Sequence, residues 1–241
     1  DRNTTQFSNC SVRNSNWHGT FVASLIASNT NDGYGIAGAD QSAKILPVRV
    51  LGKCGGTISD MVDGMRWSAG LDVPGVPRNS TPAQVLNLSL GSPSFCSSFE
   101  QNAVNQIRAQ GSVIVAAAGN GGGRADSPAR CNGVIGVAAL DEDGLKTPYS
   151  ASGTGVNIAA PGGWNRFLVG AGNAGTTVAT THNLTQKTGT SFAAPLVAAA
   201  AGLLKGLNPL LSPDEIADIL NRSARPFATA TNLVCVAETA F

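Results

Sequence analysis

Residues 112–120 read SVIVAAAGN, a near-continuous apolar run that stops at a glycine–asparagine turn. A run without polar alternation is typical of a strand covered on both faces, as in parallel sheets. Active sites of such sheets form at the carboxyl ends of the strands. The stretch therefore predicts a buried parallel strand that brings Gly119 and Asn120 to the edge of the sheet where chemistry takes place.

Strands and helices alternate along the rest of the chain. We expect further strands over residues 44–51, 85–90 and 134–139. We expect helices over residues 59–68 (with Ser59 as N-cap), 99–109 and 191–204, and a last one that follows residues 211–213 and ends at Ala224. This alternation indicates an α/β fold of three layers, a mostly parallel β-sheet flanked by helices. No repeat or linker divides the sequence, so residues 1–241 are predicted to form a single domain.

Charge and hydropathy argue against two classes of partner. The 241 residues carry a formal net charge of +1, and 13% of them are charged, about half the usual share. No basic stretch points to nucleic acid, and no run approaches the roughly 18 apolar residues of a membrane span. The chain opens at Asp1, and its first residues lack the basic and apolar pattern expected of a signal peptide. We expect a monomeric processed product or fragment, incomplete at its N-terminus and also at its C-terminus.

A serine at the start of the last strong apolar helix is the first candidate for chemistry. Residues 188–195 read TGTSFAAP, which places Ser191 between a glycine turn and an alanine-rich helix. Serine is a common helix N-cap without catalytic duty, but a charge that develops there would lie near the positive end of the helix. A nucleophilic serine also needs a base. The chain has two histidines, His18 and His182, and composition does not choose between them.

Four segments together resemble the motif blocks of the subtilisin family: HGT at residues 18–20, NLSLG at 87–91, AAGN at 117–120 and GTSFAAP at 189–195. The resemblance runs from about Asn16 to Ser223. It implies a subtilisin-like fold and a serine endopeptidase that acts through an acyl-enzyme. By this resemblance Ser191 is the nucleophile, His18 the general base and Asn120 an oxyanion donor together with the Ser191 amide.

The resemblance also implies a substrate cleft. One wall would consist of Ser89, Leu90 and Gly91, the other of Gly55 and Gly56, with Gly119 next to the oxyanion donor. A polypeptide would bind there by strand addition, where backbone hydrogen bonds supply affinity. We expect polypeptide substrates, and a pro-segment or protein inhibitors as further partners. The sequence is most similar to secreted bacterial members with extra disulfides, so an extracellular location is expected.

The catalytic aspartate of the family has no counterpart in the expected place. The family carries it about thirty residues before the histidine, whereas Asp1 precedes His18 by seventeen residues and no strand comes before it. We therefore expect this chain alone to be nearly inactive. The alternative is a non-catalytic fragment or pseudoprotease that binds polypeptides. An α/β-hydrolase esterase is disfavoured, because both histidines precede Ser191.

The five cysteines lack the short paired spacings of zinc sites. Their wide spacing favours disulfides and an oxidising compartment over buried free thiols. We expect a Cys96–Cys131 bridge on the oxyanion side of the cleft. We also expect a Cys10–Cys54 bridge that ties the segment before His18 to the other wall, which leaves Cys235 over.

Two further features leave alternatives open. The loop with Asn29, Asn31 and Asp32 has the oxygen-rich character of a structural calcium site, a habit of the family, or is a plain polar loop. No cofactor for the chemistry is expected.

Asp126 follows a glycine-rich turn. Facing the primary pocket, it would favour a basic residue at the cleaved bond; pointing to solvent, it would leave a broad apolar preference, and we favour the second.

Overall fold

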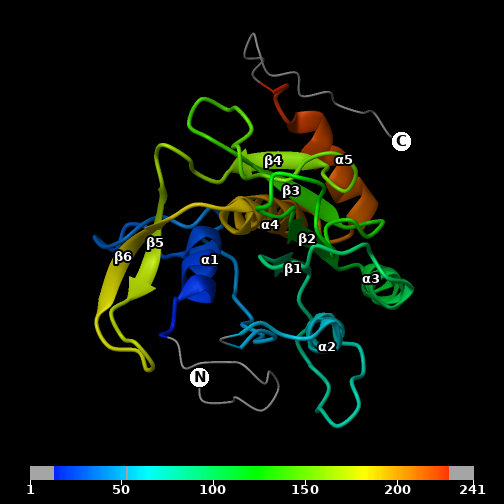
Figure 1. Ribbon diagram of the computed structural model, residues 1–241. Coiled ribbons are helices and arrows are strands. Elements are labelled where there is room, and N and C mark those ends of the chain that lie inside the picture. The colour runs from blue at the N-terminus through cyan, green and yellow to red at the C-terminus, as the bar shows by residue number, and fades with distance from the viewer. Residues whose placement is uncertain (1–13, 53, 228–241) are drawn as a thin grey trace.

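Helices cover both faces of a four-stranded parallel sheet in the computed structural model, which describes residues 14–52 and 54–227 (Figure 1). The helices are α1 (His18–Ala27), α2 (Ile58–Ser68), α3 (Ser98–Ala109), α4 (Thr190–Leu207) and α5 (Pro213–Ser223). The sheet consists of β1 (Val85–Leu88), β2 (Val113–Ala117), β3 (Ile135–Leu140) and β4 (Ile158–Pro161), paired in that order. The expected three-layer α/β fold is confirmed, and so are the four helices and the strands near residues 85–90, 112–118 and 134–139.

The apolar run that predicted the sheet forms one of its two central strands. All five residues of β2 are buried. Val113, Val115 and Ala117 belong to the apolar cluster that includes α4 and α5, whereas Ile114 and Ala116 belong to the cluster that includes α2 and α3. Successive side chains of a strand point to opposite faces. The strand therefore divides the core into two layers and stabilises both by apolar burial.

Capping boxes set the starts of three helices. In α2 the Thr57 side chain accepts from the backbone N–H of Asp60, and the Asp60 side chain accepts from the Thr57 N–H. The predicted N-cap Ser59 is therefore wrong, because Thr57 already satisfies the first free amides of the helix. The same arrangement opens α3 at Ser97 and α5 at Ser212.

The strand predicted over residues 44–51 is not formed. These residues are irregular, and β1 pairs with β2 alone among the described strands. A strand needs a hydrogen-bonding neighbour, and none of the described strands lies on this side of β1. Val48 and Val50 still pack closely on Gly64 of α2, where a Cβ would clash with Val50 and lie 3.3 Å from Val48 Cγ1. Val48 and Val50 thus pack on α2, although residues 44–51 pair with no described strand.

A strand of the sheet and a separate hairpin were missed by the sequence reasoning. These are β4 and the antiparallel pair β5 (Leu168–Asn173) and β6 (His182–Lys187). The hairpin packs on α1, where a Cβ on Gly170 would lie 2.9 Å from the Phe21 ring. Its glycines and polar residues hide the strand pattern, since apolar alternation is the main sequence signal of a strand.

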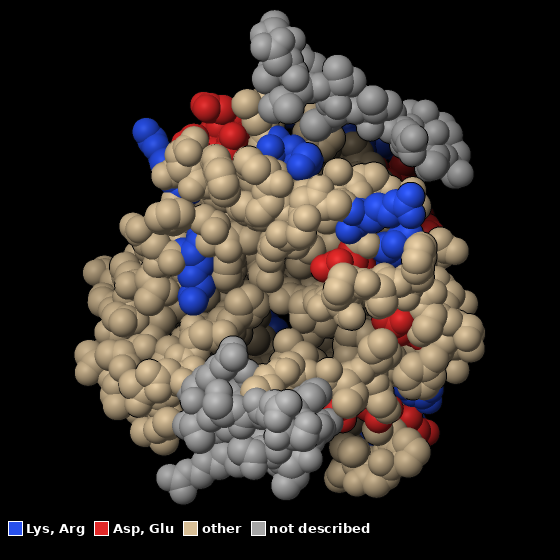
Figure 2. Space-filling model, viewed as in Figure 1, with Lys and Arg blue, Asp and Glu red and all other residues tan. Residues whose placement is uncertain are grey.

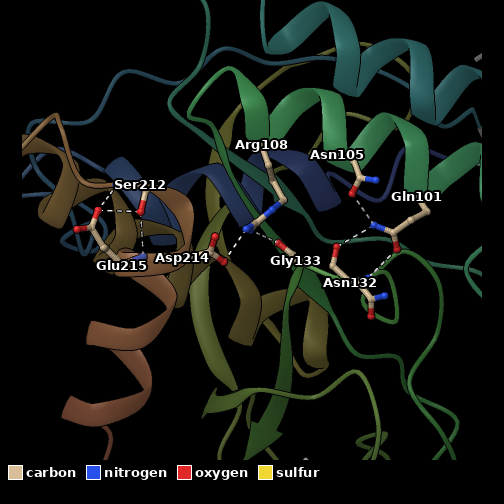
Figure 3. Close-up of polar contacts among 8 residues, drawn as sticks. All are labelled: Gln101, Asn105, Arg108, Asn132, Gly133, Ser212, Asp214 and Glu215. Carbon is tan, nitrogen blue, oxygen red and sulfur yellow. Dashed lines mark hydrogen bonds and ion pairs between the residues drawn. The ribbon is translucent and has the colours of Figure 1, made fainter. Parts of the chain in front are cut away.

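Polar contacts fix α3 to α5 and to the loop between β2 and β3 (Figure 3). The Arg108 guanidinium donates to Gly133 O at 2.8 Å and forms an ion pair with Asp214 at 2.6 Å. Gln101 donates to Asn132 O at 3.0 Å and accepts from its N–H at 2.8 Å. These contacts hold the loop that leads from the end of β2 back into β3.

Charged side chains are sparse on the face shown in Figure 2, and neither sign forms a continuous patch there. Among the described helices, α4 alone is long and apolar enough to cross a membrane, with 18 residues. More than half of this helix, 56%, is buried, and it contacts all four strands of the sheet. We interpret α4 as the core helix of the fold.

Candidate active site

Ser191 lies in the first turn of α4, where the helix leaves its backbone amides free. The N-cap is Gly189, whose φ of 145° places it in a region that favours glycine. The Thr190 amide bonds to Asn120, and the Phe192 amide bonds to Gly189 O. Within the described residues the Ser191 amide has no hydrogen bond. A free donor next to the Ser191 hydroxyl, at the positive helix end, can receive a developing negative charge.

A proline inside α4 explains how Ser191 is tied to β1. Pro195 has no N–H to bond the carbonyl of Ser191, four residues earlier. The hydroxyl of Ser89, just after β1, donates to that carbonyl at 2.6 Å, and Asn87 donates to the Ser89 hydroxyl at 2.9 Å. In return, Ser191 Oγ donates to Ser89 O at 3.3 Å. The backbone of Ser191 is thus fixed to the carboxyl end of β1.

The orientation of the Asn120 carboxamide follows from its two hydrogen bonds. Asn120 Oδ1 accepts from Thr190 N at 2.9 Å and from Thr190 Oγ1 at 3.0 Å. Because a backbone N–H only donates, the accepting atom must be the oxygen. The exposed Asn120 therefore has its oxygen fixed at the start of α4, and its NH₂ group has no hydrogen bond to any residue in the described part of the chain.

Thr190 was not singled out from the sequence, although it organises this side of the site. Its side chain is fully buried, and its hydroxyl also accepts from Gly119 N at 3.2 Å. One hydroxyl thus joins the end of β2 to the start of α4. The one sequence signal for Thr190 is its position between Gly189 and Ser191. That position does not reveal which groups its hydroxyl contacts.

His18 is the first residue of α1 and lies against α4. Trp17 before it adopts a left-handed conformation with φ of 53°, and the His18 amide donates to Asn16 Oδ1 at 3.0 Å. The imidazole centroid is 5.3 Å from that of Phe192, the residue after Ser191. Within the described residues Ser191 Oγ bonds to Ser89, and no hydrogen bond joins it to His18. The structure thus brings His18 next to the nucleophile candidate without a formed bond.

Two effects favour the neutral form of the His18 imidazole. Burial lowers the pKa of His18, and the positive charge of Lys187 lowers it further. Among residues 14–52 and 54–227, no carboxylate pairs with this imidazole. Asp1 lies outside the described residues. A neutral imidazole is the form that can accept a proton from a serine.

The second histidine lies elsewhere. His182 is the first residue of β6, is exposed, and pairs across the hairpin with Asn173. Only His18 of the two packs on the first turn of α4. The position of α1 therefore makes His18 the better placed of the two histidines for a role beside Ser191.

The predicted wall residues lie at the ends of β1 and β2 and before α2. Ser89, Leu90 and Gly91 directly follow β1, and Gly119 follows β2. Gly55 belongs to a tight turn in which it exchanges backbone hydrogen bonds with Gly52 at 2.7 and 3.2 Å. Gly56 comes so close to Val50 O that a Cβ would overlap it. The turn thus depends on glycine for its close backbone approach.

The Cys96–Cys131 disulfide is present, with its Cα atoms 5.1 Å apart. It joins the residues before α3 to the loop between β2 and β3, as expected. Cys54 is also disulfide-bonded. Cys10 and Cys235 lie outside the described residues, so the Cys10–Cys54 pairing stays a prediction.

The predicted calcium ligands lie in the exposed loop after α1. Asn31 adopts a left-handed conformation with φ of 63°, and Asp32 accepts from Tyr34 N at 3.1 Å. In the described part of the chain, no three His, Cys, Asp or Glu residues gather. Calcium takes six to eight oxygen ligands. Asn29, Asn31 and Asp32 supply one carboxylate and two amides, which do not complete such a shell, so calcium binding stays an untested prediction.

Comparisons with known proteins agree with this geometry. The model of the subtilase family matches residues 1–237. An extracellular protease of Xanthomonas campestris is 41% identical over 92% of this chain, and an extracellular basic protease of Dichelobacter nodosus is 43% identical over 88% of it. The chain spans 38% and 36% of the lengths of these two proteins. Subtilisin Savinase of Lederbergia lenta is 36% identical over 92% of this chain and 75% of its own length.

Solved structures show the same similarity. A protease of Pseudoalteromonas arctica superposes with a TM-score of 0.86 and 44% identity, over 90% of this chain and 67% of its own. A cold-adapted subtilisin-like serine proteinase superposes with a TM-score of 0.68 and 27% identity, over 85% of this chain and 67% of its own. With a family match over nearly the whole chain, the conclusion is direct: the chain belongs to the subtilase family of subtilisin-type serine peptidases.

Proposed function

We propose that the protein is an endopeptidase that cleaves polypeptides through an acyl-enzyme on Ser191. The observation that carries this proposal is the convergence of three groups at the N-terminus of α4. They are the Ser191 hydroxyl, the unpaired Ser191 amide and the Asn120 carboxamide fixed by Thr190. Two donors beside a nucleophile are what an acyl transfer needs to stabilise its oxyanion. His18, packed on Phe192, supplies the base.

The reaction has two halves. In the first, Ser191 Oγ attacks the substrate carbonyl carbon while His18 accepts the hydroxyl proton. The Ser191 amide and Asn120 Nδ2 donate to the oxyanion; the C–N bond then breaks, and the leaving amine takes the proton from His18. In the second half, His18 deprotonates a water molecule that attacks the acyl ester. The ester C–O bond breaks and Ser191 recovers its proton.

The extension of β1 is suited to hold an extended peptide. Residues 89–91 continue past the last pairing of β1 with β2, so part of their backbone is free for a substrate strand. The turn at Gly55 and Gly56 would form the opposite wall. A pro-segment or a protein inhibitor would occupy the same cleft. Relatives named as extracellular proteases support an extracellular location.

The acid that orients His18 is the missing part of this proposal. No carboxylate in the described part of the chain pairs with the imidazole. Loss of the triad aspartate lowers turnover about 10⁴-fold in a serine protease with otherwise intact geometry. We therefore propose that residues 1–241 alone are nearly inactive, and that the orienting carboxylate comes from outside residues 14–52 and 54–227.

Covalent labelling separates a protease from a polypeptide-binding protein. We expect a fluorophosphonate to label the full-length protein, Ser191→Ala to abolish the labelling, and Ser223→Ala, a matched change at the end of α5, to leave it intact. Hydrolysis of a chromogenic peptide should follow the same order. Peptide binding without labelling would support the non-catalytic alternative. Hydrolysis by the 241-residue chain at the rate of the full-length protein would contradict its proposed inactivity.

A further inference from the structure

The loop between β2 and β3 returns to the carboxyl edge of the sheet. There it bonds to the residues that directly follow β1 and β2, which we call the extensions of these strands. Asp126 N donates to Ala118 O at 2.7 Å, just past the end of β2. The next residue, Ser127, exchanges two backbone hydrogen bonds with Ser92, at 2.9 and 3.0 Å, past the end of β1. Residues 126–127 therefore bridge the extensions of β1 and β2; below, these two extensions are called the walls and residues 126–127 the floor.

Both walls are glycine where they meet the Asp126 side chain. A Cβ on Gly119 would overlap the Asp126 carboxylate, and a Cβ on Gly91 would lie 3.2 Å from Asp126 Cβ. Gly119 has a φ of 112°, which L side chains rarely adopt. The carboxylate thus lies between the walls. These contacts favour the pocket-facing alternative for Asp126 over the solvent-facing one.

The floor is anchored from the side of α3. Ser127 Oγ donates to the buried Glu100, and the other carboxylate oxygen of Glu100 accepts from Ser97 at the start of the helix. The Cys96–Cys131 disulfide joins the residues on either side of this contact. A floor held by a hydrogen-bonded carboxylate and a covalent bridge keeps its shape when a ligand binds.

The Asp126 carboxylate has no counter-charge. It forms no hydrogen bond or ion pair with any residue of 14–52 and 54–227. Burial alone raises the pKa of Asp126, with no contribution from a neighbouring charge. The Arg130 guanidinium, four residues on, lies 4.1 Å from the centre of the Phe95 ring instead. A partly desolvated carboxylate without a partner gains free energy when a cation pairs with it.

We infer that Asp126 determines the primary specificity of the enzyme: it selects a lysine or arginine whose carbonyl carbon is attacked by Ser191. This inference rests on the proposed endopeptidase function. Ser191 bonds to Ser89 in the extension of β1. The Asp126 side chain lies beside Gly91 of the same extension, two residues further along the chain. Two residues of extended chain span roughly 7 Å. Lysine and arginine stems can pack along such a wall while the cation reaches the carboxylate.

A pair of substrates tests the inference. The full-length protein is assayed with two peptide p-nitroanilides that differ only in the residue before the cleaved bond, lysine or phenylalanine. We expect kcat/KM to favour lysine about tenfold or more. Asp126→Asn, which removes the charge but keeps the shape, should lower the lysine value by about a hundredfold and change the phenylalanine value by less than about threefold. Asp143→Asn, the same change in an exposed turn after β3, should alter neither.

A binding measurement gives a readout that does not require catalysis. p-Aminobenzamidine is an aromatic cation whose fluorescence reports binding. We expect it to bind the wild-type protein, Ser191→Ala and Asp143→Asn alike, and Asp126→Asn to raise its Kd about tenfold or more.

These outcomes separate the specificity from the activity. A lysine-to-phenylalanine ratio that Asp126→Asn leaves unchanged overturns the inference, even if both peptides are cleaved well. If neither peptide is cleaved, the endopeptidase function fails and p-aminobenzamidine decides the rest. Binding that depends on Asp126 then still supports a cation pocket, whereas binding that Asp126→Asn leaves unaffected, or no binding at all, overturns it.

Discussion

Ser89 and Ser191 are joined by two hydrogen bonds that run in opposite directions. The Ser89 hydroxyl donates to Ser191 O at 2.6 Å, and the Ser191 hydroxyl donates to Ser89 O at 3.3 Å. The first bond replaces the helical bond that Pro195 cannot make. Under the proposed function, a substrate peptide that added to residues 89–91 would bind to the same backbone that fixes Ser191.

We expect Ser89→Ala to lower both activity and stability. The change leaves the Ser191 carbonyl without a donor, and an unsatisfied half-buried carbonyl costs about 1–3 kcal/mol. The fluorophosphonate labelling rate should fall several-fold, and the urea midpoint should fall as well. Ser92→Ala is the matched control, because Ser92 bonds to Ser127 through its backbone alone. Equal effects of the two changes would show that the Ser89 hydroxyl has no special role.

We expect Thr190→Val to impair the oxyanion side of the site while the substrate wall stays intact. Valine keeps the shape but removes the hydroxyl that donates to Asn120 and accepts from Gly119 N. The Asn120 carboxamide then keeps only the hydrogen bond from Thr190 N. Since the loss acts on the transition state, kcat should drop about tenfold or more with KM little changed.

The conservative variant checks this explanation. Thr190→Ser keeps the hydroxyl and should retain most of the activity, because both hydrogen bonds can still form. If Thr190→Ser loses as much kcat as Thr190→Val, the methyl group and its packing are responsible, and the hydroxyl is not the positioning group.

The sequence predicted the central layers of the fold because its signals there are local. An apolar run is enough for β2, and the alanine-rich stretch is enough for α4. The strand predicted over residues 44–51 failed because pairing depends on a partner that lies elsewhere in the chain. A pattern of apolar side chains indicates that a segment prefers to be buried. It does not identify the neighbouring segment that buries it.

The sequence suggested candidate residues for the site, whereas their contacts had no local signal. The resemblance pointed to Ser191, His18 and Asn120, but the link from Ser89 to Ser191 joins positions 102 residues apart. The position of Asp126 was equally hidden, because it follows from how the loop between β2 and β3 bonds to Ala118 and Ser92. Such long-range contacts follow from the assembled sheet and have no local sequence signal.

We expect loss of the Cys96–Cys131 disulfide to destabilise the fold. The bridge closes a loop with a sequence separation of 35 residues, for which the chain-entropy model gives about 4 kcal/mol. Cys96→Ala with Cys131→Ala should lower the free energy of unfolding by a few kcal/mol, measured by urea denaturation under non-reducing conditions. Adding a reductant should remove most of the difference between wild type and variant. Equal midpoints before reduction would contradict the prediction.

We expect the His18 imidazole of the 241-residue chain to titrate below 6.5, its ordinary pKa, because burial and then Lys187 both disfavour the imidazolium. NMR can follow it alone in His182→Gln, since the chain has two histidines. Lys187→Gln should raise the pKa part of the way towards 6.5, since burial, the larger cause, persists. Lys44→Gln, an exposed charge removed elsewhere, should not shift it. A lower pKa keeps the base neutral at more acidic pH, so His18 loses its base function only as the pH falls through this lowered value. A pKa at or above 6.5, or equal responses to the two lysine changes, would contradict this account.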